Sequence, residues 1–129
     1  MSKRMQIILG VIGVVILTGV ILFALIAPST SDACKNARGH TYTAIISGSQ
    51  VSLGSLNAKQ CDKLTIINND KVTREIAFGP HNDHVPYDGV AEKILNQNQS
   101  FTITLNTTGT YRWHDHLHDK VQGYFTVNK

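Results

Sequence analysis

Three histidines near the C-terminus occupy alternate positions: His114, His116 and His118 are separated by Asp115 and Leu117. Alternate side chains of an extended strand lie on one face, so an extended backbone here would gather the three imidazoles. Neutral imidazole is the commonest metal ligand among side chains near pH 7. The spacing therefore predicts a metal site, whereas a single histidine in this place would indicate only a solvated strand end.

A second pair of histidines, His81 and His84, lies in a segment with two prolines and two aspartates that predicts a long loop. Two intervening residues allow both imidazoles of one loop turn to reach the same ion. All-imidazole ligation suits copper(II), zinc or nickel, and the order of affinities favours copper, so copper is the predicted ion and zinc the second candidate. The predicted ligands are His81, His84, His114, His116 and, as the weakest candidate, His118.

Two aspartates close to these histidines, Asp83 and Asp119, are candidates to orient imidazoles through their second ring nitrogen. The alternative for each aspartate is a solvated loop carboxylate. His40 lies apart from both clusters in the sequence and is expected at the surface.

Short runs rich in β-branched and aromatic residues, separated by turn residues, predict the strands that must position these side chains. No stretch after Ala27 has a helical period. Many short strands in a domain of about one hundred residues predict an all-β sandwich. The expected strands cover residues 42–47, 50–53, 63–68, 73–78, 100–105, 110–113 and 123–127, and residues 90–95 form either a short strand or one helical turn.

The N-terminal residues 7–27 carry no charge and are almost wholly apolar. A run of about twenty apolar residues matches the thickness that a transmembrane helix must span. Lys3 and Arg4 precede the run, which predicts a cytoplasmic N-terminus and a domain on the extracytoplasmic side, periplasmic or extracellular. A cleaved signal peptide is the alternative, although its apolar region is usually shorter. We expect a signal-anchor helix at residues 1–28, a linker at 29–40 and one domain at 41–129.

The formal net charge of +3 includes Lys3 and Arg4, so the exported part is close to neutral and offers no basic run for nucleic acid. The chain has two cysteines, Cys34 and Cys61. An isolated pair in an oxidising compartment most simply forms a disulfide. Metal thiolates are the weaker alternative, because neither cysteine is near a histidine cluster in the sequence.

Several motifs follow one another in a characteristic order. An Asn-x-Asp turn at residues 68–70 follows an apolar strand, and a further strand and a His-containing loop come next. Residues 109–118 then read Gly-Thr-Tyr-x-Trp-His-x-His-x-His, and Gly123 leads into a final Phe-x-Val strand. This order, over roughly residues 41–127, resembles the cupredoxins, which are small Greek-key β-sandwiches that hold copper at one end. The chain looks most like exported cupredoxin-like proteins with His-Asp-His where blue-copper relatives have His-Cys-His.

The resemblance implies that the blue-copper position is altered. By the motif, the thiolate position falls at Asp115, the first histidine at Arg74, the second at His118 and the axial ligand near Val121. A blue site needs two histidines, a thiolate and a weak axial ligand, so the resemblance implies a non-blue site. Arg74 and Asp115 would then form a guanidinium–carboxylate pair in place of the metal.

With Asp115 pointing inward, its neighbours His114 and His116 would point outward and meet the loop histidines. The resulting hypothesis is a membrane-tethered, extracytoplasmic copper-binding protein with a histidine-rich site, acting in copper handling. An electron-transfer cupredoxin and a metal-free structural β-sandwich are the alternatives. The residues favour a binding protein over an enzyme, and a redox or copper-delivery partner protein and a homo-oligomer both stay open.

Overall fold

The computed structural model describes residues 34–129, and the predicted signal-anchor helix lies outside the described residues. Within residues 34–129 the chain forms nine β-strands and no helix. The all-β prediction is therefore confirmed for this part of the chain. No helix long and apolar enough to cross a membrane is found among residues 34–129.

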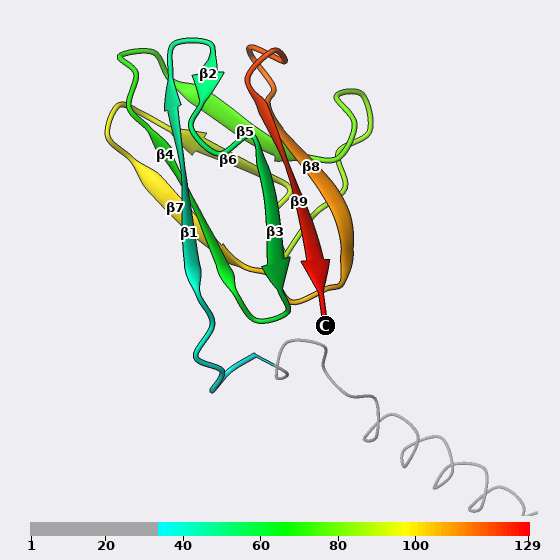
Figure 1. The fold of residues 1–129 in the computed structure, drawn as a ribbon. Helices are drawn as coiled ribbons and strands as arrows, with labels where there is room; N and C mark the ends of the chain where they lie inside the picture. Colours follow the sequence, from blue (N-terminus) through cyan, green and yellow to red (C-terminus); the bar gives the residue numbers. More distant parts are fainter. Residues whose placement is uncertain (1–33) are drawn as a thin grey trace, which may run out of the picture. The chain divides into compact units, whose positions relative to one another are not determined.

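The strands form two sheets that face each other (Figure 1). The first sheet has the order β2-β1-β4-β7, in which β1 and β4 are parallel and the other neighbours are antiparallel. Its strands are β1 (Thr41–Ser47), β2 (Gln50–Val51), β4 (Lys63–Asn68) and β7 (Ser100–Thr104).

The second sheet has the order β3-β9-β8-β5-β6, with a parallel pair at β3 and β9. Its strands are β3 (Ser55–Lys59), β5 (Arg74–Phe78), β6 (Glu92–Leu95), β8 (Gly109–Asp115) and β9 (Gln122–Asn128). β8 lies between β5 and β9 and carries His114 at the level of Ala77 on one neighbour and of Gln122 on the other.

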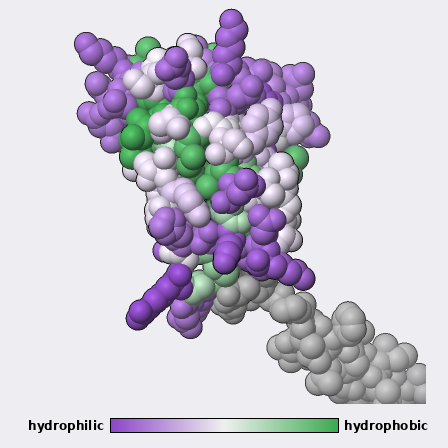
Figure 2. Space-filling view, viewed as in Figure 1, coloured by the Kyte–Doolittle hydropathy of each residue, from purple (hydrophilic) through white to green (hydrophobic). Residues whose placement is uncertain are grey.

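The core lies between the two sheets and is formed by the alternate, inward-pointing residues of the strands. Its largest buried apolar side chains include Leu64, Ile66, Ile76, Phe78, Ile103, Trp113 and Phe125. Figure 2 shows hydrophobic residues through the middle of one face, with hydrophilic residues toward both of its ends. Polar side chains buried at one end of the sandwich therefore differ from the apolar side chains that form its core.

Two elements differ from the sequence-based expectation or complete it. β3 was not predicted, because Asn, Ala and Lys are depleted in strands and only Leu56 and Ala58 face the core. Its pairing with β9, a contact distant in sequence, overrides that weak composition. Residues 92–95, for which a strand and a helical turn were both open, form the edge strand β6.

A disulfide joins Cys34 to Cys61, as predicted. The same region is also held by backbone hydrogen bonds, because His40 N donates to Asp62 Oδ1 at 2.7 Å and Lys63 N donates to His40 O at 2.7 Å. Residues 34–40, placed in the linker by the sequence, are thus tied to the β-sandwich at the start of β4.

The loop between β5 and β6 follows a sharp turn at Gly79, whose φ is +85°. A side chain at this position would meet Val85 N at 2.9 Å, so the turn requires glycine. Gly79 N donates to Arg112 O at 2.9 Å, which fixes the loop to the edge of β8. This loop carries both of the histidines at positions 81 and 84, and Figure 1 shows it extending beside β8.

Candidate metal site

β8 presents two chemically different faces at its C-terminal end. Trp113 belongs to the hydrophobic core and Asp115 is buried on the same inner side. His114, between them, points to the opposite face by strand alternation. It is 0% exposed all the same, and the rings of His81 and His84 lie 5.4 Å and 5.3 Å from its own.

Four imidazoles gather on this outer face. One ligand nitrogen from each of His81, His114 and His116 lies within 4.8 Å of the others. His84 joins them through Nε2, which is 3.1 Å from His116 Nδ1. The ring of His81 stacks on that of His116 with centroids 4.5 Å apart. The structure thus brings together the two loop histidines and the two strand histidines.

Several nitrogens of this cluster have no hydrogen-bond partner although they are shielded from solvent. These atoms are His81 Nδ1, His114 Nδ1 and His114 Nε2. A buried polar atom without a partner is destabilising and uncommon in native proteins. Burial lowers the pKa of His114, and the nearby Arg112 guanidinium lowers it further. The ring is therefore neutral near pH 7 and keeps a lone pair for a ligand.

Carboxylates flank the cluster on two sides. Glu92 Oε1 lies 2.6 Å from His84 Nδ1, and this contact holds the pKa of Glu92 below its ordinary value. A proton on His84 Nδ1 would leave the Nε2 lone pair facing the other imidazoles. On the far side, Asp119 Oδ1 lies 3.7 Å from His81 Nδ1 and 4.0 Å from His114 Nε2.

His118 lies apart from the four. β8 ends at Asp115, so the extended backbone that would place all three histidines on one face does not continue to residue 118. A turn replaces it, because Asp115 Oδ1 accepts a hydrogen bond from Leu117 N and Asp115 O accepts one from His118 N, both at 3.0 Å. His118 Nδ1 consequently lies 3.0 Å from Asp115 Oδ2, and its side chain is 52% exposed.

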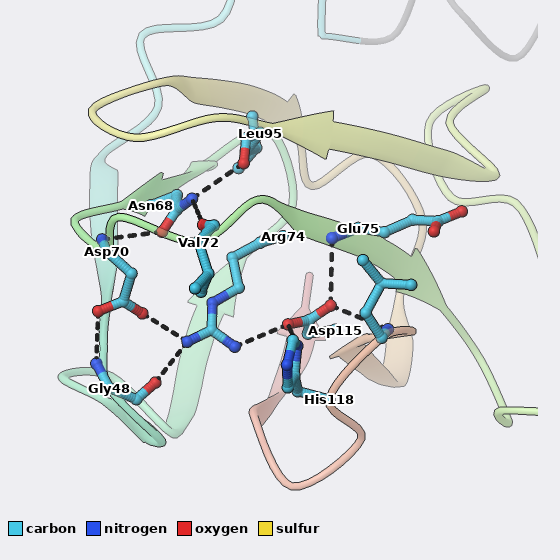
Figure 3. A network of polar contacts seen from close by, with 10 residues as sticks. Gly48, Asn68, Asp70, Val72, Arg74, Glu75, Leu95, Asp115 and His118 are labelled. Atoms are coloured by element: carbon cyan, nitrogen blue, oxygen red, sulfur yellow. Dashed lines mark hydrogen bonds and ion pairs between the residues drawn. The ribbon is translucent and has the colours of Figure 1, made fainter.

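The inner face of β8 holds an ion pair within a polar network (Figure 3). Arg74 Nη1 donates to Asp115 Oδ2 at 2.9 Å, with side-chain exposures of 5% and 0%. Arg74 Nη2 also donates to Asp70 Oδ2 at 2.6 Å and to Gly48 O at 2.8 Å. The guanidinium therefore connects β5 and β8 with the turns at residues 48 and 70.

Asp115 is well supplied with donors for a buried carboxylate. Its Oδ1 accepts hydrogen bonds from Glu75 N at 3.1 Å and from Leu117 N at 3.0 Å, in addition to the Arg74 bond on Oδ2. Burial alone would raise the pKa of Asp115, but the Arg74 and backbone hydrogen bonds outweigh it, and the pKa lies below the ordinary value. The carboxylate is therefore charged in the folded state at neutral pH.

Asn68 supports the same network from β4. Its Nδ2 donates to Val72 O at 2.8 Å and to Leu95 O at 2.9 Å, while its Oδ1 accepts from Asp70 N at 2.9 Å. The residue is fully buried. It fixes the turn that presents Asp70 to Arg74, and this explains the Asn-x-Asp pattern after the apolar strand.

Glu92 was not among the site residues predicted from the sequence. It pairs with Ala77, which pairs with His114 on its other side, so Glu92 and His114 flank Ala77 on one face of the sheet. This register joins residues that are far apart in the sequence, and no local pattern reveals it.

Asp119 lies beside the cluster, whereas Asp83 is exposed in the loop.

The aromatic residues near the site belong to the core. Tyr87 packs against Phe78, Tyr111 and Phe125, and its hydroxyl donates to Thr107 O at 3.1 Å. Burial raises the pKa of Tyr87 to about 12.

Pro80 and Val85, which bracket the loop histidines, line an apolar pocket of about 410 Å³ together with Phe78, Tyr111 and Arg112.

No protein-family model matches the chain, and no curated protein sequence matches it. Among solved structures, a reduced amicyanin mutant is similar at 22% identity, with 78% of this chain and 95% of that one covered and a TM-score of 0.57. The Cu(I) form of another amicyanin mutant gives 23% identity, 78% and 95% coverage and a TM-score of 0.57.

A purple cupredoxin from Nitrosopumilus maritimus gives 20% identity, covers 67% of this chain and 98% of its own, and has a TM-score of 0.57. At these identities the likeness concerns the fold, which agrees with the two facing β-sheets described above. The chain has a cupredoxin-like fold.

Proposed function

We propose that the chain is a membrane-tethered, extracytoplasmic copper-binding protein that holds copper(II) through His81, His84, His114 and His116. Its role would be copper handling: binding the ion outside the cytoplasm and passing it to, or withholding it from, other proteins. The single observation that carries the proposal is His114, which is fully buried among three other imidazoles and has two ring nitrogens without a partner.

The donor set suits an ion of this kind. Two nitrogens bound to one ion at about 2.0–2.1 Å lie roughly 2.9–3.4 Å apart at square-planar or tetrahedral angles. His84 Nε2 and His116 Nδ1 form a hydrogen bond of 3.1 Å with each other, and that separation also lies within this range. Imidazole ligands bind copper(II) more tightly than zinc in the general order of affinities, so copper is the proposed ion and zinc its competitor.

The inner-face network supports a non-blue site. By the cupredoxin resemblance, Arg74, Asp115 and His118 occupy the positions of blue-copper ligands. Arg74 and Asp115 bond to each other, and His118 bonds to Asp115. We infer that this network replaces the blue site as a structural connection and that copper binds on the opposite face of β8. A bound copper ion would supply a Lewis-acidic, redox-active centre there.

The proposed location outside the cytoplasm has two supports. The Cys34–Cys61 disulfide is typical of oxidising compartments. The apolar, uncharged run at residues 7–27, preceded by Lys3 and Arg4, is typical of a signal-anchor. Tethering would keep the site at the extracytoplasmic side of the membrane, where it could meet a partner protein.

A metal-free structural module is the second candidate, and the Arg74–Asp115 pair favours it. An ion pair at the old metal position could stabilise the sandwich without any cofactor. The unpartnered nitrogens of the outer face favour the copper proposal over this one, because a purely structural module would gain nothing from burying them.

The test is a titration of the purified full-length chain with copper(II), followed by electron paramagnetic resonance, in wild type and in His114→Ala/His116→Ala. We expect one tight equivalent with a type-2 signal in wild type and its loss in the double variant. Weak binding that is equal in both proteins would overturn the copper proposal and leave the metal-free module. A parallel zinc titration decides between the two ions.

A further inference from the structure

Asp119 occupies the turn between β8 and β9 and faces the imidazole cluster. Its Oδ1 accepts a hydrogen bond from Arg112 Nη2 at 2.6 Å. The same oxygen lies 3.7 Å from His81 Nδ1 and 4.0 Å from His114 Nε2. These distances are too long for hydrogen bonds, so the carboxylate touches the arginine and stops short of the histidines.

The two nitrogens that Asp119 faces are unpartnered. His81 Nδ1 and His114 Nε2 are shielded from solvent and have no hydrogen-bond partner. His114 is 0% exposed, and its Nε2 lies 4.0 Å from the carboxylate oxygen of Asp119. An ion bound by these two nitrogens would lie next to Asp119 Oδ1.

The separations agree with a shared ion. Donor atoms that bind one ion at about 2.0–2.2 Å lie roughly 2.9–4.3 Å apart, from adjacent to opposite positions. The 3.7 Å and 4.0 Å separations from Asp119 Oδ1 to His81 Nδ1 and His114 Nε2 both fall in that range. By contrast, Glu92 contacts His84 through Nδ1, the nitrogen opposite the one that faces the cluster.

Asp119 is free to change partner at small cost. Its side chain is 49% exposed, and an exposed ion pair contributes little to stability because water and salt screen it. Arg112 has a second acceptor, because its Nε donates to Gln122 Oε1 at 2.8 Å. The arginine can therefore stay in place when the carboxylate leaves it.

We propose that Asp119 exchanges Arg112 for the metal ion and becomes an oxygen ligand of the site. This inference rests on the proposed copper function and deepens it by adding an anionic oxygen ligand, which gives a physical reason for copper(II) over copper(I). Copper(I) is selected by soft thiolate and thioether ligands, whereas a carboxylate favours the divalent ion. Soft ligands are absent from residues 34–129, since Cys34 and Cys61 form the disulfide and the two methionines are Met1 and Met5.

The experiment compares Asp119→Asn with Asp83→Asn in the full-length chain. Asp83 is an exposed carboxylate of the loop with the two histidines, so its variant controls for the loss of one negative charge. Copper(II) and copper(I) affinities are measured by competition with chelators of known affinity, and the copper(II) form is recorded by electron paramagnetic resonance. Far-ultraviolet circular dichroism checks that each variant is folded.

We expect Asp119→Asn to weaken copper(II) binding by about tenfold or more and copper(I) binding by less than about threefold. Its copper(II) spectrum should change, because an anionic oxygen ligand is lost. Asp83→Asn should leave both affinities and the spectrum close to wild type. If the two variants behave alike, Asp119 is not a ligand, and the all-histidine proposal stands without it. If wild type binds no copper, both proposals fail together.

Arg112→Gln gives an independent check that does not depend on the Asp119 variant alone. In the chain that retains Asp119, Arg112→Gln removes the competing partner of this carboxylate and should tighten copper(II) binding. In the Asp119→Asn background the same change should have a smaller effect, because no carboxylate remains to be released. Equal effects in both backgrounds would mean that Arg112 acts only by its charge and would overturn the exchange.

Discussion

The two faces of β8 bury polar groups in opposite ways. On the inner face, Asp115 is fully buried and accepts hydrogen bonds from Arg74, Glu75 and Leu117. On the outer face, His114 is equally buried, yet neither ring nitrogen has a partner. Asp115 therefore has hydrogen-bond partners on both carboxylate oxygens, although Nε of its partner Arg74 has none, whereas neither ring nitrogen of His114 has a partner.

This difference separates structural from ligand-binding polar groups. Burying a charge is costly unless it is paired and hydrogen-bonded, and the carboxylate of Asp115 meets that condition through Arg74 and two backbone amides. Burying imidazole nitrogens without partners is costly as well, and a bound metal ion would satisfy one of the two ring nitrogens of His114. The inner face thus holds a hydrogen-bonded ion pair, whereas the outer face holds the unpartnered imidazole nitrogens on which the copper proposal rests.

The largest effect is expected at the inner face. Arg74→Met leaves Asp115 and Asp70 without their guanidinium, and removing one partner of a buried pair costs about 3–5 kcal/mol of unfolding free energy. Urea denaturation of the metal-free protein measures it. Arg74→Met/Asp115→Leu should lose clearly less than the sum of the two single changes, whereas additive losses would mean that the pair is not coupled.

Acid should weaken the same network. The pKa values of Asp115 and Asp70 are lowered in the folded state, so their contribution is present above the unfolded carboxyl pKa of about 4 and is lost as pH falls below it. Urea midpoints measured with a chelator from neutral to acid pH should therefore fall at the acid end. Arg74→Met/Asp115→Leu should show a shallower fall, and an unchanged slope would contradict this origin.

A smaller effect is expected at the edge of the outer face. Glu92→Gln removes the carboxylate that holds His84 Nδ1, and the loss of such a partner typically weakens metal binding about 10–100-fold. The stoichiometry of copper should stay the same, because the four imidazoles remain. A competition titration with Asp83→Asn as the charge control measures the change. Affinity equal to that of the control would remove Glu92 from the site.

The smallest effect is expected at His118. It contacts Asp115 rather than the cluster, and its side chain is half exposed, so His118→Ala should cost at most about 1 kcal/mol of stability. Its copper(II) affinity should stay within about threefold of wild type, well short of the loss expected for Glu92→Gln. If His118→Ala weakened copper binding as much as His114→Ala does, His118 would be a copper ligand. The metal site would then not be confined to the outer face of β8.

The sequence predicted local elements well where alternation is clean. β4 has the predicted bounds, since Leu64 and Ile66 face the core and Asn68 begins the turn. The loop with His81 and His84 and the strand with His114 were also recognisable from their residue types. The pairing of Arg74 with Asp115 could be anticipated through the resemblance, because two charged residues fall where the cupredoxin motif has copper ligands.

What the sequence left open depends on contacts between distant segments. Glu92 lies on the same face as His114 because β6 and β8 both pair with β5 at Ala77. His118 leaves the row of histidines because Asp115 accepts hydrogen bonds from the turn that follows it. β3 exists because β9 offers it a parallel partner. Strand register is a tertiary property that residue spacing alone does not encode, whereas the turn after Asp115 is local and is closed by hydrogen bonds from Leu117 and His118.

The most direct test of the contrast between the faces is thermal unfolding with and without one equivalent of copper(II). The proteins are the full-length wild type, Arg74→Met/Asp115→Leu and His114→Ala/His116→Ala. An ion that binds only the folded state raises the melting temperature. We predict a rise in wild type and in the Arg74/Asp115 variant, and none in the histidine variant. A rise lost in the Arg74/Asp115 variant and kept in the histidine variant would contradict the placement of the metal on the outer face of β8.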